Sequence, residues 1–599
     1  MSDSAEEKRD ELGDRLMDQA LREVLGGESP PELSEKILAA AEKQISVSPQ
    51  RKERVMNKSK RAARPWLLNT LVVCVLVSVT IALLLPAVQP AREAARGPTN
   101  PTRLYMLREC LSDVDDGALG QGPGNAGDQY DHLVENPFRA VKDHPLSTFS
   151  IDVDTASYAN VRRFLLDEGQ LPPPDAVRIE EMINYFHYDY AGPEDDVPFA
   201  THIAAAGCPW QPDHRLVRIG LKGKEFPSEE RPESNLVFLL DVSGSMNSPD
   251  KLPLLKAGMR LLAEQMREND RVAIVVYAQA EGLVLPSTSG ARREEILAAL
   301  EQLEAGGSTN GGAGIELAYR IARENFIPEG VNRVLLCTDG DFNVGTTSNG
   351  ALVRMVEEKA RSGVFLSVLG FGRGNLNDAM METISNKGNG NYSYIDGISE
   401  ARKVLVQQMG GTLITIAKDV KIQVEFNPAR VAAYRLIGYE NRILAAEDFN
   451  DDRKDAGEIG AGHTVTALYE VVPAGVEVDV PAVDPLKYQA AAQPGDDEPA
   501  REDLLTLKLR YKAPDADKSK RLEFPVVDTG TSFNEASPDF QFAAAVASFG
   551  MLLRNSRYKG TATYDAVLEI ATAAQGPDVH GYRAELLEIV RRAKTLSER

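Results

Sequence analysis

The chain has 599 residues, too many for one hydrophobic core, so two to four domains are expected. Its net charge of −22 at pH 7 repels phosphate backbones and argues against nucleic acid as a partner. The four cysteines show neither a CxxC pair nor zinc-ligand spacing, which argues against a fold that depends on zinc or disulfides; a bridge between Cys110 and Cys208 and two unpaired cysteines stay open as alternatives.

Two short amphipathic segments open the chain, at residues 9–26 and 31–45. Each repeats apolar residues at helical spacing but has no core of its own. Two interpretations stay open: a docking segment for a cytoplasmic partner within residues 1–50, or a loose helical hairpin ahead of a membrane anchor. We assign residues 1–64 to a cytoplasmic amphipathic segment.

An uncharged apolar stretch follows, from Leu67 to Leu85, long enough for a helix to cross about 30 Å of hydrocarbon. Basic residues are concentrated upstream of it, between Arg51 and Arg64, so the positive-inside rule places the N-terminus in the cytoplasm. A cleaved signal peptide would have a shorter basic region and a shorter apolar core. We therefore predict an uncleaved transmembrane helix over residues 65–88 and, from its Gly, Pro and Asn content, a linker over residues 89–128.

Ordered structure is expected from about residue 129, and residues 129–233 form a region ahead of the next domain. It is expected to contain strands at 146–155, 199–207 and 216–222 and helices at 156–168 and 179–188. The sequence Ile151-Asp-Val-Asp-Thr155 superficially resembles a carboxylate metal loop. We favour a polar strand end, with Thr155 capping the following helix.

An apolar run of strand length, Leu236–Leu240, ends at Asp241, and Ser243 and Ser245 follow at every second position. A buried strand therefore ends in a loop that presents one carboxylate and two hydroxyls. Because Mg²⁺ prefers about six oxygen ligands in near-octahedral geometry, these three residues are candidate metal ligands. On this loop alone, a Gly-Ser turn with Ser245 as a helix N-cap stays open as the alternative.

Apolar strands alternate with amphipathic helices throughout residues 234–410, which predicts an α/β domain with a doubly wound, Rossmann-like parallel sheet. In such sheets the binding crevice lies at the carboxyl ends of the strands, beside the switch point. Two further loops at strand ends fit this rule: the Gly-rich loop that contains Thr309, and the strand that ends at Thr338 ahead of Asp339. The sequence therefore predicts one oxygen-rich site built from three loops.

These residues resemble the metal-ion-dependent adhesion site of von Willebrand factor type A domains. The resemblance rests on Asp241-x-Ser243-x-Ser245, Thr309 and Asp339-Gly340. It implies that the two serines and Thr309 bind a metal ion directly and that the two aspartates hold it directly or through water. It also implies Mg²⁺ as the cofactor, with Mn²⁺ or Ca²⁺ as alternatives.

Such a ligand set has a physical consequence for recognition. When the direct protein ligands are mostly neutral hydroxyls, the cation stays under-neutralised and one position is open to a carboxylate from a protein partner. We expect partner contacts at the rim of the site, where Met246, Asn310 and Asp341 lie in sequence. The alternative is an intact site that only stiffens its loops or has lost its partner.

The flanks resemble a group of bacterial envelope proteins that carry a type A domain between two flanking regions. This resemblance rests on residues 145–163, 178–185 and 434–442. It implies a bacterial envelope protein. Members of the group are often lipoproteins, and this chain departs from them by its predicted transmembrane helix, which would anchor it by a single pass in the inner membrane with most of the chain in the periplasm.

The remaining chain divides into a β-rich region, 411–530, and a helical region, 531–599. Residues 420–426, 432–436, 463–471, 503–511 and 522–527 alternate as half-buried strands do. Together with the two strands before Leu236, they predict a β-sandwich into which the type A domain is inserted. Three amphipathic helices after Pro538 are expected to pack on the sandwich or on the helices near residues 156–188.

Catalysis is not indicated. The chain lacks a Gly-x-Ser-x-Gly elbow, a His-Glu-x-x-His pair and a phosphate-binding loop. His463 is the histidine that lies in an ordered-looking strand with acids nearby, and a half-buried structural role is favoured for it. The sequence thus predicts an adhesion or assembly protein of the cell envelope that binds an acidic group through a metal. The alternatives are a transmembrane regulator that signals through its N-terminal helices and, with less support, an envelope hydrolase.

Overall fold

The computed structural model describes residues 127–195, 197–227, 230–278, 281–307, 311–340, 349–408, 414–454, 456–478, 502–514 and 516–599. All of them belong to one compact unit, Gly120–Arg599. None of the helices within these ranges combines the length and apolar character that a membrane span requires. The predicted span over residues 65–88 lies outside the described residues, as do the segment 1–64, Thr309, Asn310 and Asp341.

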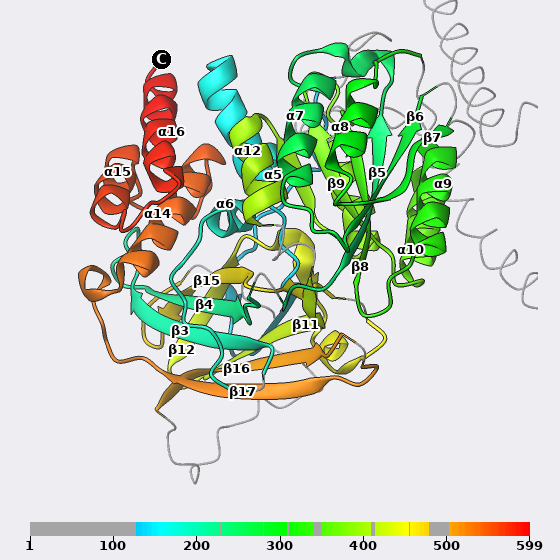
Figure 1. The fold of residues 1–599 in the computed structure, drawn as a ribbon. Coiled ribbons are helices and arrows are strands. Elements are labelled where there is room, and N and C mark those ends of the chain that lie inside the picture. Colours follow the sequence, from blue (N-terminus) through cyan, green and yellow to red (C-terminus); the bar gives the residue numbers. More distant parts are fainter. Residues whose placement is uncertain are drawn as a thin grey trace, which may run out of the picture. The chain divides into compact units, whose positions relative to one another are not determined.

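A six-stranded sheet in the order β10-β9-β8-β5-β6-β7 forms the centre of the α/β domain (Figure 1). Its strands are β5 (Ser234–Asp241), β6 (Arg271–Tyr277), β7 (Glu281–Ser289), β8 (Val331–Thr338), β9 (Phe365–Phe371) and β10 (Tyr392–Ile395). All neighbours are parallel except β7, which pairs antiparallel to β6 at one edge. Every residue of β5 and β8 is buried, which explains their continuous apolar runs. The predicted doubly wound sheet is confirmed.

Helices cover both faces of this sheet. They are α7 (Leu252–Ala263), α8 (Arg293–Glu301), α9 (Gly311–Glu324), α10 (Asn349–Ala360), α11 (Asp378–Lys387) and α12 (Ile398–Arg402), the last continuing as the π-helix η7 (Lys403–Gln407). Side chains of α7, α8 and α12 share one core with Phe238 of β5, whereas those of α9, α10 and α11 share another with Leu239. Alternate residues of one strand thus face opposite helix layers.

Two antiparallel sheets form a β-sandwich beside this domain. One has the order β1-β12-β15-β4-β3, and the other has the order β13-β2-β11-β16-β17 with β14 paired to β11. Their strands are β1 (Arg139–Ala140), β2 (Leu146–Ser150), β3 (Phe199–Gly207), β4 (Arg215–Gly223), β11 (Thr415–Phe426), β12 (Val431–Ile437), β13 (Ile443–Leu444), β14 (Ile459–Gly460), β15 (Thr464–Pro473), β16 (Asp503–Lys512) and β17 (Lys520–Val527).

Aromatic side chains join the two sheets of the sandwich. Phe426 of β11 stacks on Tyr434 of β12 with ring centroids 4.0 Å apart, and Phe149 of β2 lies 6.2 Å from Tyr469 of β15. Both sheets combine strands from before and after residues 234–408. The α/β domain is therefore an insertion in the sandwich, as the strand pattern predicted.

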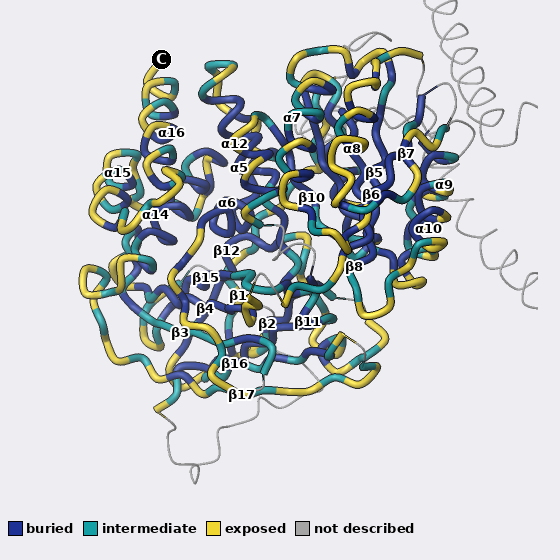
Figure 2. Tube along the Cα trace, viewed as in Figure 1, coloured by how far each residue is buried: buried dark blue, intermediate teal, exposed yellow. Residues whose placement is uncertain are grey.

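A helical layer packs against one sheet of the sandwich (Figure 2). It contains α5 (Ala156–Arg162), which continues as the π-helix η3 (Arg163–Glu168), with α6 (Ile179–Asn184), α14 (Pro538–Leu553), α15 (Tyr564–Ala573) and α16 (Tyr582–Ser597). Its core joins Ile179 and Phe542 to Leu468 of β15. The helix α6 is shorter than the sequence pattern predicted, because it ends at Asn184.

Candidate metal site

The site begins at Asp241, the last residue of β5. The carboxylate is fully buried, and its Oδ1 accepts a hydrogen bond from the backbone N–H of Ser243 at 2.8 Å. This bond turns the chain back directly after the strand. Its Oδ2 accepts a longer bond from the Thr338 hydroxyl, at 3.4 Å, so neighbouring strands β5 and β8 are joined at their carboxyl ends.

Two serine hydroxyls lie together beyond this turn. Ser243 Oγ and Ser245 Oγ are 3.0 Å apart; Ser243 is buried and Ser245 is exposed. A short 3₁₀ helix, η6 (Gly244–Asn247), carries Ser245, and Ser243 occupies its N-cap position without a side-chain capping bond. The alternative interpretation of Ser245 as a helix N-cap is therefore wrong. Met246, which we expected at the rim, is fully buried, so its side chain belongs to the core beneath the loop.

Asp339 supplies the second carboxylate, directly after β8. It is fully buried and accepts hydrogen bonds from Lys251 Nζ, at 2.9 Å, and from the hydroxyl of Ser245. Gly340 follows with φ = +94°, and a Cβ there would lie 2.4 Å from the backbone nitrogen of Asn377. Only glycine fits this turn, which holds Asp339 against the loop that follows β9.

The two carboxyl groups have different proton affinities. Burial raises the pKa of Asp241 to about 6, although bonds from Ser243 oppose the shift. Burial also disfavours the charged form of Asp339, but the bonds from Lys251 and Ser245 outweigh it and hold its pKa below the usual value. Asp339 is therefore ionised at neutral pH. Of the two carboxyl groups, Asp241 is the one that titrates nearer to physiological pH.

Backbone bonds attach the Gly-rich loop to the same place. Gly244 N–H donates to Gly307 O at 3.0 Å, and Gly306 N–H donates to Val242 O at 2.7 Å. The loop then leads through Thr309, outside the described residues, into α9. There Gly314 packs closely, because a Cβ would lie 2.9 Å from Cβ of Tyr277. A side chain at position 314 would therefore clash with Tyr277.

The donor chemistry fits a hard divalent cation. Asp241, Ser243, Ser245 and Asp339 offer carboxylate and hydroxyl oxygens and lie within one continuous hydrogen-bonded group at the switch point between β5 and β8. Sequence reasoning missed Lys251, which lies outside the motif spacing, and Asn375, whose amide oxygen accepts from Lys251 Nζ at 3.1 Å. The sequence did contain a signal for Asn375, because it follows a third parallel strand, β9, and the carboxyl ends of parallel strands form the binding edge of such a sheet.

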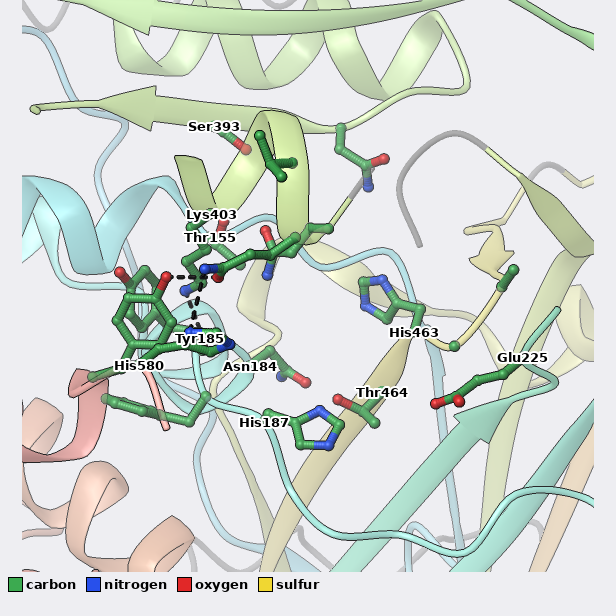
Figure 3. A pocket seen from close by; sticks show the side chains of 18 of the residues that line it. Thr155, Asn184, Tyr185, His187, Glu225, Ser393, Lys403, His463, Thr464 and His580 are labelled. Carbon is green, nitrogen blue, oxygen red and sulfur yellow. Dashed lines mark hydrogen bonds between the residues drawn. The ribbon is translucent and has the colours of Figure 1, made fainter. Parts of the chain in front are cut away.

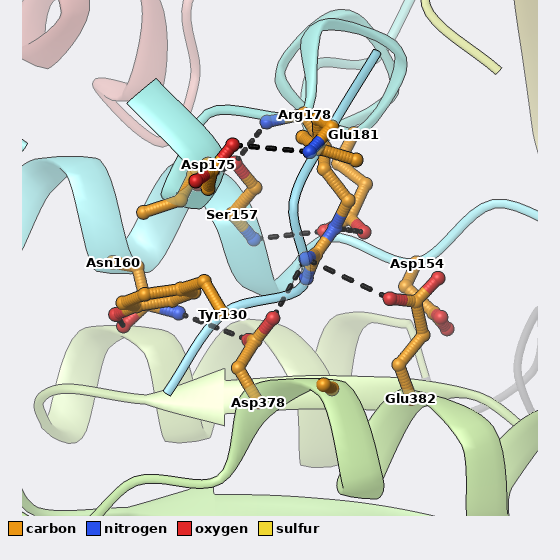
Figure 4. A network of polar contacts seen from close by, with 12 residues as sticks. Tyr130, Asp154, Ser157, Asn160, Asp175, Arg178, Glu181, Asp378 and Glu382 are labelled. Carbon is orange, nitrogen blue, oxygen red and sulfur yellow. Dashed lines mark hydrogen bonds and ion pairs between the residues drawn. The ribbon is translucent and has the colours of Figure 1, made fainter. Parts of the chain in front are cut away.

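A second polar cluster joins the α/β domain to its flank (Figure 4). Carboxylate oxygens of Asp154, Glu181 and Glu382 lie within 4.8 Å of one another, and burial raises the pKa of Asp154 well above its usual value. These oxygens already have partners: Arg178 pairs with Glu181, and Arg442 lies 3.3 Å from Asp154 and 3.1 Å from Glu382. The cluster is an ion-pair network rather than an open metal loop.

The neighbouring Thr155 does not behave as predicted. It precedes α5, but its side chain makes no capping hydrogen bond. The N-terminal turn of α5 is held by Glu181 instead, whose Oε2 accepts from the backbone N–H of Ser157 at 2.8 Å. A carboxylate from a distant helix therefore replaces the local cap.

A cavity of about 780 Å³ lies between the sandwich, η7 and the C-terminal helices (Figure 3). Lys403 Nζ lines it and donates to the backbone oxygen of Tyr185 at 2.8 Å, and burial lowers the pKa of this amine well below its usual value. His463 also lines it, half-buried directly before β15, and burial lowers its pKa to about 4. The described residues that line this cavity do not include Asp241, Ser243, Ser245 or Asp339 of the candidate metal site.

Comparison with protein families gives three matches. A profile for the von Willebrand factor type A domain matches residues 236–341, and one for von Willebrand factor matches residues 125–218. A third, described as the C-terminal region of the uncharacterized protein YfbK, matches residues 411–596. The first match contains both described aspartates of the site, and the third covers the second half of the sandwich and the C-terminal helices.

Two curated relatives resemble this chain to different extents. The uncharacterized protein YfbK of Escherichia coli (strain K12) is 46% identical over 483 residues, which are 80% of this chain and 82% of that protein. The human inter-alpha-trypsin inhibitor heavy chain H4 is 30% identical over 147 residues, which are 23% of this chain and 16% of that protein. Similarity to the bacterial protein thus extends over the flanks, whereas similarity to the human protein is local.

Solved structures also resemble this chain, with low TM-scores. An aerotolerance-related membrane protein from Bacteroides fragilis is 25% identical, with 29% of this chain and 98% of that chain covered and a TM-score of 0.26. A von Willebrand factor type A protein from Catenulispora acidiphila is 15% identical, with 68% and 91% covered and a TM-score of 0.38.

Proposed function

This chain belongs to the family of the Escherichia coli protein YfbK and contains a von Willebrand factor type A domain, and from this premise we propose that it binds an acidic group of a protein partner through a divalent cation. The cation is held by Asp241, Ser243, Ser245, Thr309 and Asp339. Mg²⁺ is the proposed ion, with Mn²⁺ and Ca²⁺ as alternatives that titration distinguishes.

One observation carries the proposal: the hydroxyl of the exposed residue Ser245 contacts oxygens of both loops that build the described part of the site. It lies 3.0 Å from Ser243 Oγ and bonds to the carboxylate of Asp339, while both aspartates are excluded from solvent. Among the described residues of the site Ser245 is the exposed one, so a cation placed among these oxygens would be reached from solvent on the serine side. A carboxylate from another molecule can complete its coordination there.

The role that follows is binding at the cell envelope, for adhesion or assembly, without catalysis. The uncharged stretch Leu67–Leu85 and the basic residues before it support a single-pass anchor in the bacterial inner membrane, with the N-terminus in the cytoplasm and the type A domain in the periplasm. Topology reporters fused after residue 60 and after residue 599 test this placement, because they must report opposite sides of the membrane.

Calorimetric titration of Mg²⁺, Mn²⁺ and Ca²⁺ into the purified full-length protein tests the metal site. The Asp241→Ala and Ser243→Ala variants are expected to lose binding, whereas Glu316→Ala, which removes an exposed acid from α9, is expected to retain it. The proposal fails if none of the three ions binds, or if the site variants bind as the unsubstituted protein does.

A further inference from the structure

A lysine ammonium contacts one carboxylate of the proposed metal site. Lys251 is buried, and its Nζ is 2.9 Å from Asp339 Oδ2 and 3.1 Å from the amide oxygen of Asn375. It is the residue directly before α7, whose backbone it joins through a bond from Leu255 N–H to its carbonyl oxygen at 2.8 Å. The ammonium therefore forms an ion pair with one oxygen of Asp339, a carboxylate that would also bind the metal.

The backbone around Lys251 is shaped to hold this position. Its aliphatic stem crosses Gly372, where a Cβ would lie 2.2 Å from Lys251 Cε. Gly372 also has φ = +71°, a conformation that side-chain-bearing residues rarely adopt. The loop after β9 thus leaves a channel for the lysine and places Asn375 at its end. A lysine held at both its stem and its ammonium loses little further entropy when it pairs with Asp339.

The charge balance of the site depends on this ammonium. Asp241 and Asp339 supply two negative charges when ionised, and the serines supply none. Lys251 returns one positive charge, so the described side chains contribute a net charge of −1. A divalent ion bound among them keeps about one unit of uncompensated positive charge, whereas two aspartates alone would neutralise it.

Building on the proposed function, we infer that Lys251 sets the specificity of this site for a carboxylate of an acidic peptide. Lys251 lowers the affinity of the site for the cation. It also strengthens the attraction of the bound cation for that carboxylate. The ammonium repels the cation directly, and it draws the electron density of one Asp339 oxygen away from it. The coordination position on the serine side then needs an anionic ligand. A neutral carbonyl or amide ligand would leave the charge unbalanced.

Substitutions at Lys251 separate charge from shape. Lys251→Gln keeps a hydrogen-bond donor for Asp339 but removes the charge, Lys251→Met removes both, and Lys251→Arg keeps the charge. Lys256→Met on the same helix is the matched control, because Lys256 bonds only to the exposed backbone oxygen of Glu301 among the described residues. Each variant is made in the full-length chain and titrated with Mg²⁺ by calorimetry.

The second measurement uses two probe peptides at saturating Mg²⁺, acetyl-Gly-Asp-Gly-amide and its Asn counterpart. For Lys251→Gln and Lys251→Met we expect Mg²⁺ affinity to rise on the order of tenfold and the preference for the Asp peptide to fall by a similar factor. Lys251→Arg and Lys256→Met are expected to stay within about twofold of the unsubstituted protein.

The outcomes distinguish the inference from the proposal on which it rests. Lack of Mg²⁺ binding by the unsubstituted protein overturns the proposed function itself. Binding by the unsubstituted protein with an unchanged peptide preference in Lys251→Gln overturns the inference alone. Parallel loss of Mg²⁺ and peptide affinity in Lys251→Gln also overturns it, because that result assigns Lys251 a purely structural role.

Discussion

Arg178 of the flank reaches across to Asp378 of α11, with Nη1 2.6 Å from Oδ2 and both side chains buried. Arg178 also pairs with Glu181 (Figure 4), and Arg442 makes the same kind of bridge to Glu382 of α11. Carboxylates of the inserted type A domain are thus neutralised by arginines of the surrounding region. The two parts share buried charges as well as chain connections.

Removal of Arg178 is expected to be severely destabilising. Arg178→Met leaves Asp378 and Glu181 buried without their shared cation, which costs about 3–5 kcal/mol of the free energy of unfolding. Urea unfolding of the full-length variant measures the loss. Arg453→Met removes an arginine that is 91% exposed, and the free energy of unfolding is expected to stay nearly unchanged. Equal effects of the two substitutions would contradict the shared network.

The proposed metal affinity is expected to depend on pH through Asp241. Its pKa of about 6 means that a proton competes with the cation below pH 6, so affinity falls toward tenfold per pH unit there and is level above about pH 7. Asp339 does not add to this slope near neutrality, because its pKa is lowered. Calorimetric Mg²⁺ titration from pH 5 to pH 8 measures the profile. A constant dissociation constant across that range would show that Asp241 is not a ligand.

The same raised pKa of Asp241 predicts that the free energy of unfolding of the metal-free protein falls as the pH rises. The folded state binds the Asp241 proton more tightly than the unfolded state does, so between about pH 4 and pH 6 the folded state carries more protons. Asp241 therefore stabilises the fold at low pH, and this contribution is lost as the pH rises through 6. Urea unfolding with a chelator present measures the slope. Asp241→Asn is expected to make the slope less steep, and an unchanged slope in that variant would assign it to other groups.

The segment around Asp128, where the described residues begin, supports the loop that holds Asn375. Asp128 Oδ1 accepts from the backbone N–H groups of Gly374, at 2.9 Å, and Leu376, at 3.2 Å. Asp128→Ala leaves both donors without this acceptor, at a cost of about 1–3 kcal/mol locally. Faster amide hydrogen exchange at Gly374 and Leu376 is the expected result, with weaker Mg²⁺ binding. Asp131→Ala, an exposed neighbour, is the control, and equal exchange in both variants would argue against the support.

Much of the type A domain was predictable because its signals are local. The apolar run of β5 ends abruptly at Asp241, and the run of β8 ends at Thr338, so strand pairing alone brings Asp241 and Asp339 to one edge. The glycine at 340 marked a turn that the structure shows to be sterically closed to other residues. Periodicity and turn chemistry were therefore sufficient for the sheet and for placing the four described candidate residues, Asp241, Ser243, Ser245 and Asp339, at one edge of it.

The remaining features depend on contacts between distant parts of the chain. No sequence spacing links Lys251 to Asp339 or Arg178 to Asp378, because these pairs form only after separate loops or domains meet. Thr155 failed as a predicted cap for the same reason, since Glu181 bonds the helix terminus from another helix. Met246 was misplaced because adjacent loop residues alternate between solvent and core, and a buried methionine there is indistinguishable in sequence from an exposed one.

Excision of the type A domain provides the sharpest test of its dependence on the flank. A fragment of residues 230–408 retains the buried acids Asp378 and Glu382 but loses Arg178 and Arg442. Uncompensated buried carboxylates are strongly unfavourable, so the fragment is expected to unfold at much lower urea concentration than the full chain at pH 7. Because both tryptophans lie outside the fragment, circular dichroism is the suitable probe.

Neutral substitutions in the fragment separate this cause from the loss of packing. The pair Asp378→Asn and Glu382→Gln removes both charges while keeping side-chain volume, and it is expected to restore part of the fragment's stability. The same pair in the full chain is expected to destabilise, because it leaves Arg178 and Arg442 without acceptors of opposite charge. Opposite signs in the two contexts would identify the shared ion pairs as the cause. Destabilisation in both contexts would instead mean that the two acids are needed within the type A domain itself.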